Sequence, residues 1–255
     1  MHNHKIPMRT VRLYVLVSCL TFVSIMILGV STGILPVRRT VLTDARPVSP
    51  VFILDPGHGG EDGGAEGADG TLEKHLNLDT ALTMEALADF LGYPAVLTRT
   101  DDTMLYARYD SQPTSVRKKK SYDLRNRLRF AEESGGSLFC SIHMNKFPQT
   151  ECRGLQVYYG PAAEASGSYA AILQNYARAF LDPENDRETK KADSSIYLLH
   201  RIEMPAVLVE CGFLSNPEEC ALLNTPAYRQ KTAAVLTAAL AEGWEAGLGQ
   251  KKTEK

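Results

Sequence analysis

The sequence predicts an α/β domain in which a single mixed, mostly parallel sheet lies between layers of helices. Short apolar runs without polar alternation, such as 51–54, 138–142 and 206–209, are typical of strands buried on both faces. Stretches with helical spacing of apolar residues separate these runs, and strands that alternate with helices form sheets covered on both sides. We therefore expect one three-layer domain.

Length and composition indicate how large a core the domain can bury and which classes of partner it can bind. The chain has 255 residues, of which 44% are apolar, so it can bury one substantial core. Lys and Arg number 28 against 30 Asp and Glu, which gives a net charge of −2. Because such a chain lacks the excess of basic residues typical of nucleic-acid-binding proteins, we expect no nucleic-acid partner.

The cysteines show no disulfide framework. The chain has five, Cys19, Cys140, Cys152, Cys211 and Cys220, and no two of them are spaced as C-x-x-C. Cys140 and Cys211 lie in or at the end of apolar runs, so we expect them to be buried free thiols. A bridge between Cys152 and Cys220 stays open.

An apolar segment precedes the domain. Residues 13–35 form an uncharged run of 23 with basic residues on both sides. The run is long enough to cross a bilayer and exceeds the apolar core of about 7–15 residues in a cleavable signal peptide. We expect a single-pass anchor that holds the domain on the extracytoplasmic face of a bacterial membrane, although basic residues at both ends leave the charge rule undecided. Ser31 and Gly33 keep cleavage open.

The chain is thus expected to have four parts: an anchor over 1–35, a linker with prolines over 36–50, the globular domain over 51–246 and a polar tail over 247–255.

The first strand of the domain, 51–54, runs into a loop of Pro56 and five glycines that ends at Gly64. Glycines open backbone angles closed to other residues, so this loop can pass close to a ligand. A helix is expected next over 72–91, with Thr71 as its cap and Gly92 at its end.

The remaining elements follow from periodicity and from breakers. We expect a strand at 95–98, a loop over 99–120, a helix at 123–133, strands at 138–142 and 155–159, a helix at 168–181, a polar loop at 182–187, strands at 196–200 and 206–209, a short helix after 216–217 and a helix at 226–246.

Polar side chains follow three of these strands. His58, His143 and Glu210 each come after a strand end, where ligand sites of such sheets lie. Glu73 begins the first helix and can lean over the same edge. Two imidazoles and a carboxylate with one position left open are the ligand set of a catalytic zinc. Glu210 would then be the general base that takes a proton from water and returns it to a leaving amine.

Each of these residues also has a structural interpretation. A histidine at a strand end is often a hydrogen-bonded structural residue, and a glutamate in a first helical turn often interacts with the helix dipole. Asp55 and Asp62 are alternative ligands, although Asp55 is expected to hold its own turn. Spacing alone leaves a zinc site and a structural cluster equally open, and the H-E-x-x-H motif is absent from the sequence.

Four segments resemble the signatures of zinc-dependent N-acetylmuramoyl-L-alanine amidases: 54–60 (LDPGHGG), Glu73, 141–145 (SIHMN) and 209–216 (VECGFLSN). The resemblance covers about 51–246. It implies a catalytic domain of the zinc-exopeptidase/phosphorylase-like fold that binds one Zn²⁺ through His58, Glu73 and His143, with Glu210 as the catalytic residue. The implied reaction is hydrolysis of the amide between the lactyl group of muramic acid and L-alanine in peptidoglycan.

Within this family the chain is similar to the short, membrane-anchored amidases of endospore formers that prepare cortex peptidoglycan for germination (the CwlD type). The segments 196–200 and 205–210 also resemble that group. Two departures are visible: Lys146 stands where the family usually has a small residue, and Ala131-Glu132 replaces a frequent Ala-Asn pair. Neither position is a proposed ligand. Whether an activating partner is needed stays open.

Two other functions remain as alternatives. One is a zinc exopeptidase that acts on peptide amides, and the other is a non-catalytic wall-binding protein, which should have lost a ligand or the base. The basic run 117–120 either contacts the acidic stem peptide or is a solvated loop.

Overall fold

The computed structural model describes residues 51–105 and 115–249. They form one mixed sheet of six strands in the order β2-β1-β3-β6-β4-β5. The strands are β1 (Phe52–Pro56), β2 (Ala95–Leu97), β3 (Leu138–Asn145), β4 (Gln156–Tyr159), β5 (Lys190–Lys191) and β6 (Ala206–Phe213). The first four in this order are parallel to one another, and β4 runs antiparallel to β6. The predicted mixed, mostly parallel sheet is confirmed.

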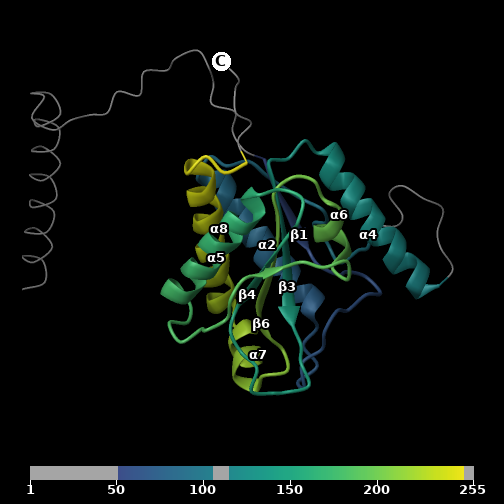
Figure 1. Cartoon of the computed structure of the whole chain (residues 1–255). Helices are drawn as coiled ribbons and strands as arrows, with labels where there is room; N and C mark the ends of the chain where they lie inside the picture. The colour runs from purple at the N-terminus through teal and green to yellow at the C-terminus, as the bar shows by residue number, and fades with distance from the viewer. Residues whose placement is uncertain (1–50, 106–114, 250–255) are drawn as a thin grey trace, which may run out of the picture. The chain divides into compact units, whose positions relative to one another are not determined.

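Helices cover both faces of the sheet, which confirms the three-layer arrangement. They are α2 (Glu73–Phe90), α4 (Val116–Glu133), α5 (Ala165–Phe180), α6 (Tyr197–Arg201), α7 (Pro217–Leu223) and α8 (Pro226–Glu245). Helices α2, α5 and α8 lie on one side of the sheet and α4 and α6 on the other (Figure 1). Each side buries its own apolar cluster.

Strand alternation divides the sheet between these two clusters. On β3, Leu138, Cys140 and Ile142 face the α2–α5–α8 cluster, whereas Phe139 faces the α4–α6 cluster. Ser141 and His143 continue the second series because side chains two residues apart share a face. The polar end of β3 therefore lies on the face that α4 and α6 cover only in part.

Two helix starts follow the chemistry expected of capping residues. Asn216 accepts hydrogen bonds from the N–H groups of Glu218 and Glu219 at the start of α7. Thr225 accepts one from Tyr228 N at the start of α8. A proline follows each cap at the first helical position, where its missing N–H costs nothing.

The strand predicted over 196–200 is wrong, because Tyr197–Arg201 forms helix α6. Periodicity cannot separate a short apolar run in a strand from one in a buried helix, and Leu198 and Leu199 are buried here from a helix. The edge strand is instead β5, whose two exposed lysines carry no apolar signal.

The loop predicted over 99–120 is too long, since α4 already begins at Val116. Ser115 caps it by accepting a hydrogen bond from Lys118 N. The first turns of α4 are charged and solvent-facing, so they show no apolar periodicity.

Several expectations lie outside the described residues: the anchor over 1–35, the linker over 36–50, much of the tail over 247–255, and the centre of the 99–120 segment. Among the helices that the structure does describe, none is both long and apolar enough to cross a membrane.

Candidate metal centre and active site

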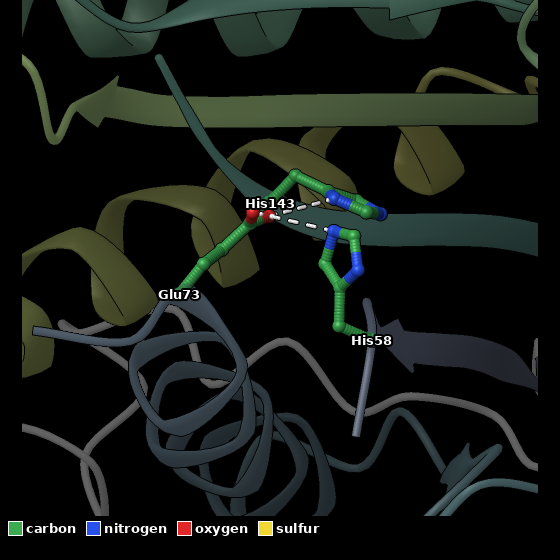
Figure 2. A group of neighbouring side chains, drawn as sticks. All are labelled: His58, Glu73 and His143. Carbon is green, nitrogen blue, oxygen red and sulfur yellow. Dashed lines mark hydrogen bonds and ion pairs between the residues drawn. The ribbon is translucent and has the colours of Figure 1, made fainter. Parts of the chain in front are cut away.

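The three predicted ligands converge at the carboxyl edge of the parallel strands. Ligand atoms of His58, Glu73 and His143 all lie within 4.8 Å of one another. Figure 2 shows the Glu73 carboxylate beside both imidazole rings, 3.2 Å from His58 Nε2 and 2.8 Å from His143 Nδ1. The rings meet edge to face with centroids 4.9 Å apart. Glu73 and His143 follow His58 by 15 and 85 residues in the sequence, yet the three side chains form one cluster.

His58 is held in an unusual backbone conformation. Its φ is +63°, a region that residues other than glycine rarely adopt and that is often found at functional sites. The ring Nδ1 lies 2.8 Å from Asp62 Oδ2, which leaves Nε2 directed at Glu73. The backbone oxygen of His58 accepts a hydrogen bond from Arg127. Hydrogen bonds therefore fix both the backbone oxygen and the imidazole ring of His58. Because Asp62 binds Nδ1, the ring nitrogen that faces the cluster is Nε2.

The glycine-rich loop also builds the start of α2. Glu73 N donates to Ala65 O and Lys74 N donates to Gly63 O, so loop carbonyls satisfy the first N–H groups of the helix. The prediction that Thr71 caps this helix is wrong. Leu72 occupies the N-cap position, and its side chain makes no capping hydrogen bond. The loop reverses directly into the helix and brings Glu73 back beside His58.

Two glycines make room for the cluster. A Cβ at Gly57 would lie 2.3 Å from ring atoms of His143. A Cβ at Gly64 would lie 2.5 Å from Glu73 Oε2 and 2.8 Å from His58 Cδ2, and the φ of Gly64 is +71°. Any side chain at either position would displace a predicted ligand.

We expect Gly57→Ala to leave the fold intact but to weaken metal binding about tenfold or more, since the added methyl group pushes the His143 ring away from Glu73. Metal titration followed by calorimetry measures this. Gly167→Ala is the matched control, because a Cβ there meets nothing closer than 3.7 Å. Equal metal affinity in Gly57→Ala and wild type would contradict the packing argument.

The Glu73 carboxylate is oriented by neighbours other than the histidines. Oε2 accepts a hydrogen bond from Ala65 N at 2.7 Å, and Oε1 accepts from Met144 N at 3.0 Å and from Asn77 Nδ2 at 3.1 Å. Burial alone would raise its pKa, but the hydrogen bonds and charges of His143 and His58 hold the pKa well below its usual range. Glu73 is therefore an ionised, fixed carboxylate in a buried position.

The pKa of His58 is shifted in the opposite direction. Burial lowers it, and the carboxylates of Asp62 and Glu73 more than compensate, raising the pKa to about 9. The two carboxylates therefore stabilise positive charge on His58, and a cation bound at Nε2 would be stabilised by Glu73 in the same way.

Glu210 stands beside the cluster and outside it. It pairs with His143 across β3 and β6, so the two side chains lie on the same face of the sheet. Its Oε2 is buried and has no hydrogen-bond partner among the described residues. Burial raises the pKa of Glu210 to about 7. The sequence placed His143 and Glu210 after strand ends, whereas β3 continues through His143 to Asn145 and β6 continues through Glu210 to Phe213.

His58, His143 and Glu210 line a cavity of about 630 Å³, whereas Glu73 lies behind the two histidines and is not among its lining residues. Tyr158 and Lys190 line the same cavity. A cavity of this size accommodates a small-molecule-sized segment of a larger substrate.

The residues fit a bound metal ion. Two nitrogen donors and one carboxylate oxygen are a donor set that zinc accepts at catalytic sites. The unpaired Oε2 of Glu210 fits the same interpretation, since a buried acceptor needs a donor and a water molecule in the cavity would supply one.

The expectation that Asp55 holds its own turn is wrong. Asp55 is fully buried, and its carboxylate accepts hydrogen bonds from Thr98, Ser141 and Arg127. Arg127 also pairs with Asp123 at 2.7 Å. Asp62 is not one of the three clustered ligands but the partner of His58 Nδ1.

Sequence reasoning missed the two arginines that support the loop. Arg127 donates to the carbonyl oxygens of Pro56 and His58, and Arg99 donates to those of Pro56 and Gly57. A signal was present for Arg127, since it lies between Leu124, Leu128 and Ala131 on the apolar face of a predicted helix. Arg99 follows a strand in an aperiodic segment and has no such signal.

The basic run 117–120 is helical and is not a solvated loop. Lys119 pairs with Glu61, and Lys120 lies 3.0 Å from Asp62. The start of α4 is therefore bound to the loop that carries His58.

Four cysteines lie in the described part of the chain and all are free thiols. Cys140 and Cys211 are buried, as predicted, and Cys152 and Cys220 do not form the bridge that the sequence left open.

The fold and the cluster define a hydrolase domain with a potential metal site beside a buried carboxylate. Comparison with known proteins identifies the family: the model of the N-acetylmuramoyl-L-alanine amidase family (Amidase_3) matches residues 52–242. The chain belongs to this family of peptidoglycan amidases.

Three relatives illustrate the likeness. The germination-specific N-acetylmuramoyl-L-alanine amidase of Bacillus subtilis is 37% identical over 187 residues, which are 72% of this chain and 75% of that protein. The solved structure of the CwlD amidase from Clostridioides difficile, in complex with the GerS lipoprotein, is 36% identical with a TM-score of 0.72 and covers 77% of this chain and 99% of that one. The amidase LytC of Bacillus subtilis is 32% identical over 73% of this chain, which spans about a third (34%) of its length.

Proposed function

We propose that this protein is a zinc-dependent N-acetylmuramoyl-L-alanine amidase that prepares spore cortex peptidoglycan for germination. The observation that carries the proposal is the convergence of His58, Glu73 and His143 next to the unpaired Oε2 of Glu210. The spore role is supported by the likeness to a germination-specific amidase.

In this proposal His58 binds zinc through Nε2, His143 through Nδ1 and Glu73 through its carboxylate. These are the atoms that face one another in the cluster. Zinc supplies Lewis acidity, which polarises a carbonyl and acidifies water. Asp62 keeps the proton of His58 on Nδ1, so that Nε2 remains free to bind the metal.

Glu210 is the general base of the proposed reaction. Glu210 lines the cavity and its Oε2 is unpaired, so it can take the proton from the attacking water and return it to the nitrogen of L-alanine as the amide breaks. The carboxylate has no hydrogen-bond donor that would hold it in another orientation at Oε2. Its position outside the metal cluster leaves it free for proton transfer.

The product of digestion tests the reaction. Purified full-length protein, incubated with spore cortex peptidoglycan, should release stem peptides with a new N-terminal L-alanine and leave the glycan strands intact. A chelator should abolish the release, and added Zn²⁺ should restore it. Release of terminal amino acids from the stem peptides would favour the zinc exopeptidase instead, and no product under any condition would favour a wall-binding protein.

Loss of one ligand tests the metal site itself. We expect His143→Ala to lower zinc occupancy at least tenfold and to remove the rise in melting temperature that zinc gives the wild type, because a ligand that binds only the folded state stabilises it. His200→Ala is the control, since His200 is an exposed residue of α6. Unchanged zinc content in His143→Ala would remove this residue from the ligand set.

We propose further that residues 1–35 anchor the domain on the extracytoplasmic face of the membrane, where its substrate lies. Membrane fractionation combined with N-terminal sequencing of the mature protein tests this, and a mature chain that begins after Gly33 would replace the anchor with a cleaved signal peptide. A lipoprotein partner is suggested only by the described complex of a relative, and co-purification from sporulating cells tests it.

A further inference from the structure

Lys190 lies on the cavity face of the sheet, in line with the catalytic edge. It pairs with Tyr158 across β5 and β4, and Tyr158 pairs with Leu208 across β4 and β6. Residues paired across strands point to the same face, and Glu210 follows Leu208 by two residues on that face. Lys190 therefore shares the floor of the cavity with Glu210 and His143, and all three line it.

The distance suits a contact on a bound peptide. Lys190 is two strands away from Glu210 and two residues behind it, which places their Cα atoms about 12 Å apart for strands about 4.8 Å apart and a rise of about 3.3 Å per residue. The lysine side chain shortens this gap. Its ammonium group is therefore within reach of a substrate group one or two residues away from a scissile amide held at Glu210.

The ammonium group of Lys190 is not neutralised by an acidic partner among the described residues. Lys190 is exposed and makes no ion pair or side-chain hydrogen bond in the part of the chain that the structure describes. Asp193 and Glu210 are the acidic residues that line the same cavity, and neither forms an ion pair with Lys190; Asp193 Oδ1 accepts hydrogen bonds from both N and Oγ of Ser195. Lys120, which also lines the cavity, is paired with Asp62.

The two parts of a muramoyl-peptide substrate differ in charge. The muramoyl group is neutral once its lactyl carboxyl is bound as an amide, whereas the stem peptide carries free carboxylates beyond L-alanine. An unpaired cation in the cavity therefore favours contact with the peptide over contact with the glycan.

We propose that Lys190 is a specificity-determining residue that binds the carboxylate of the acidic second residue of the stem peptide. This inference rests on the proposed amidase function and adds an electrostatic preference to it. Lys191 borders the same cavity, but it pairs with Tyr159, whose ring packs on the opposite face of the sheet. Strand alternation directs the Lys191 side chain to that face, so the assignment is to Lys190 alone.

The test compares two peptidoglycan substrates that differ in one group: stems with D-glutamate at the second position, and stems in which its free carboxylate is an amide. The zinc-loaded full-length enzyme should cleave the carboxylate form with the higher kcat/KM. Lys190→Gln should lower kcat/KM for that form about tenfold, mainly through KM, because a solvent-exposed charge-assisted hydrogen bond is lost. The same variant should leave cleavage of the amidated form unchanged.

Lys191→Gln is the matched control and should retain the preference of the wild type, and Lys190→Arg should retain it as well. Equal cleavage of both substrates by the wild type, or an unchanged preference in Lys190→Gln, would overturn the assignment while the amidase function stands. If the wild type cleaves neither substrate, the proposed function itself fails, and the inference with it.

Discussion

Glu210→Gln is expected to bind zinc with the affinity of the wild type and to cleave the muramoyl amide about 10²–10⁴-fold more slowly, the usual contribution of a general base. The amide that replaces the carboxylate has nearly the same shape, so packing in β6 is preserved. It cannot accept the proton of the attacking water. Because Glu210 stands outside the cluster of His58, Glu73 and His143, the metal loses no ligand.

Two measurements on one sample separate these effects: zinc content by atomic spectroscopy and the rate at which new N-terminal L-alanine appears. Glu203→Gln makes the same chemical change at an exposed loop position and should leave both unchanged. If Glu210→Gln hydrolyses at the rate of the wild type, the base is another group. If its zinc is lost as well, Glu210 is a ligand.

The pH dependence of this reaction follows from the burial of Glu210. A base works only when ionised, so activity should fall as the pH drops through the pKa of Glu210. Burial raises that pKa to about 7, and a bound cation nearby would favour the carboxylate and lower it. The acid limb of kcat for the zinc-loaded enzyme should therefore lie below pH 7, and it should disappear in the residual activity of Glu210→Gln.

The sequence predicted that His58, Glu73 and His143 lie together because the carboxyl ends of parallel strands meet at one edge of the sheet. His58 follows one apolar run and His143 follows another, both runs were predicted as buried strands, and β1 and β3 are direct neighbours. Glu73 could be added because a helix start close in sequence to a glycine loop must return to the same edge. Their roles as ligands remain predictions that the mutations above test.

The support of the site could not be predicted to the same extent, because it depends on contacts between residues far apart in the chain. Asp55 and Arg127 are 72 residues apart, and nothing in the local sequence pairs them. Lys190 belongs to β5, a strand of two residues that is recognised by its pairing with β4 and has no apolar pattern of its own. The apolar run around Leu198 fits a strand and a buried helix equally well, and only tertiary packing decides between them.

Arg127→Met is expected to destabilise the domain by about 3–5 kcal/mol, since removing one partner of a buried ion pair leaves uncompensated buried charge. Arg127 and Asp55 are each about 1% exposed or less and lie 2.6 Å apart, and Asp123 completes the network at 2.7 Å. The variant should also loosen the loop at His58, whose carbonyl loses its donor, and weaken zinc binding. Denaturant unfolding and zinc titration measure the two effects.

Arg129→Met is the matched control, two residues away on the same helix. The Arg129–Glu133 pair is more than half exposed, and pairs of this kind contribute about 0–1 kcal/mol. Arg127→Lys keeps the charge but loses the planar fork that reaches Asp55, Asp123 and the loop carbonyls together, so its stability should lie between wild type and Arg127→Met. Equal stability of Arg127→Met and Arg129→Met would contradict a central role for the network.

The stability difference between wild type and Arg127→Met should shrink in acid. Burial alone raises the pKa of Asp55, but Arg127, Ser141 and Thr98 together hold it below the usual value of 3.8 in the wild type. A carboxyl with a lowered folded pKa adds stability above its unfolded pKa and loses it as the pH falls through the folded value. Without Arg127, burial dominates and the protonated form of Asp55 is favoured. The difference should therefore be full near pH 7 and narrow as the pH falls to about 4 and below, and a difference that stayed constant down to pH 3 would show that the charge of Asp55 is not what Arg127 compensates.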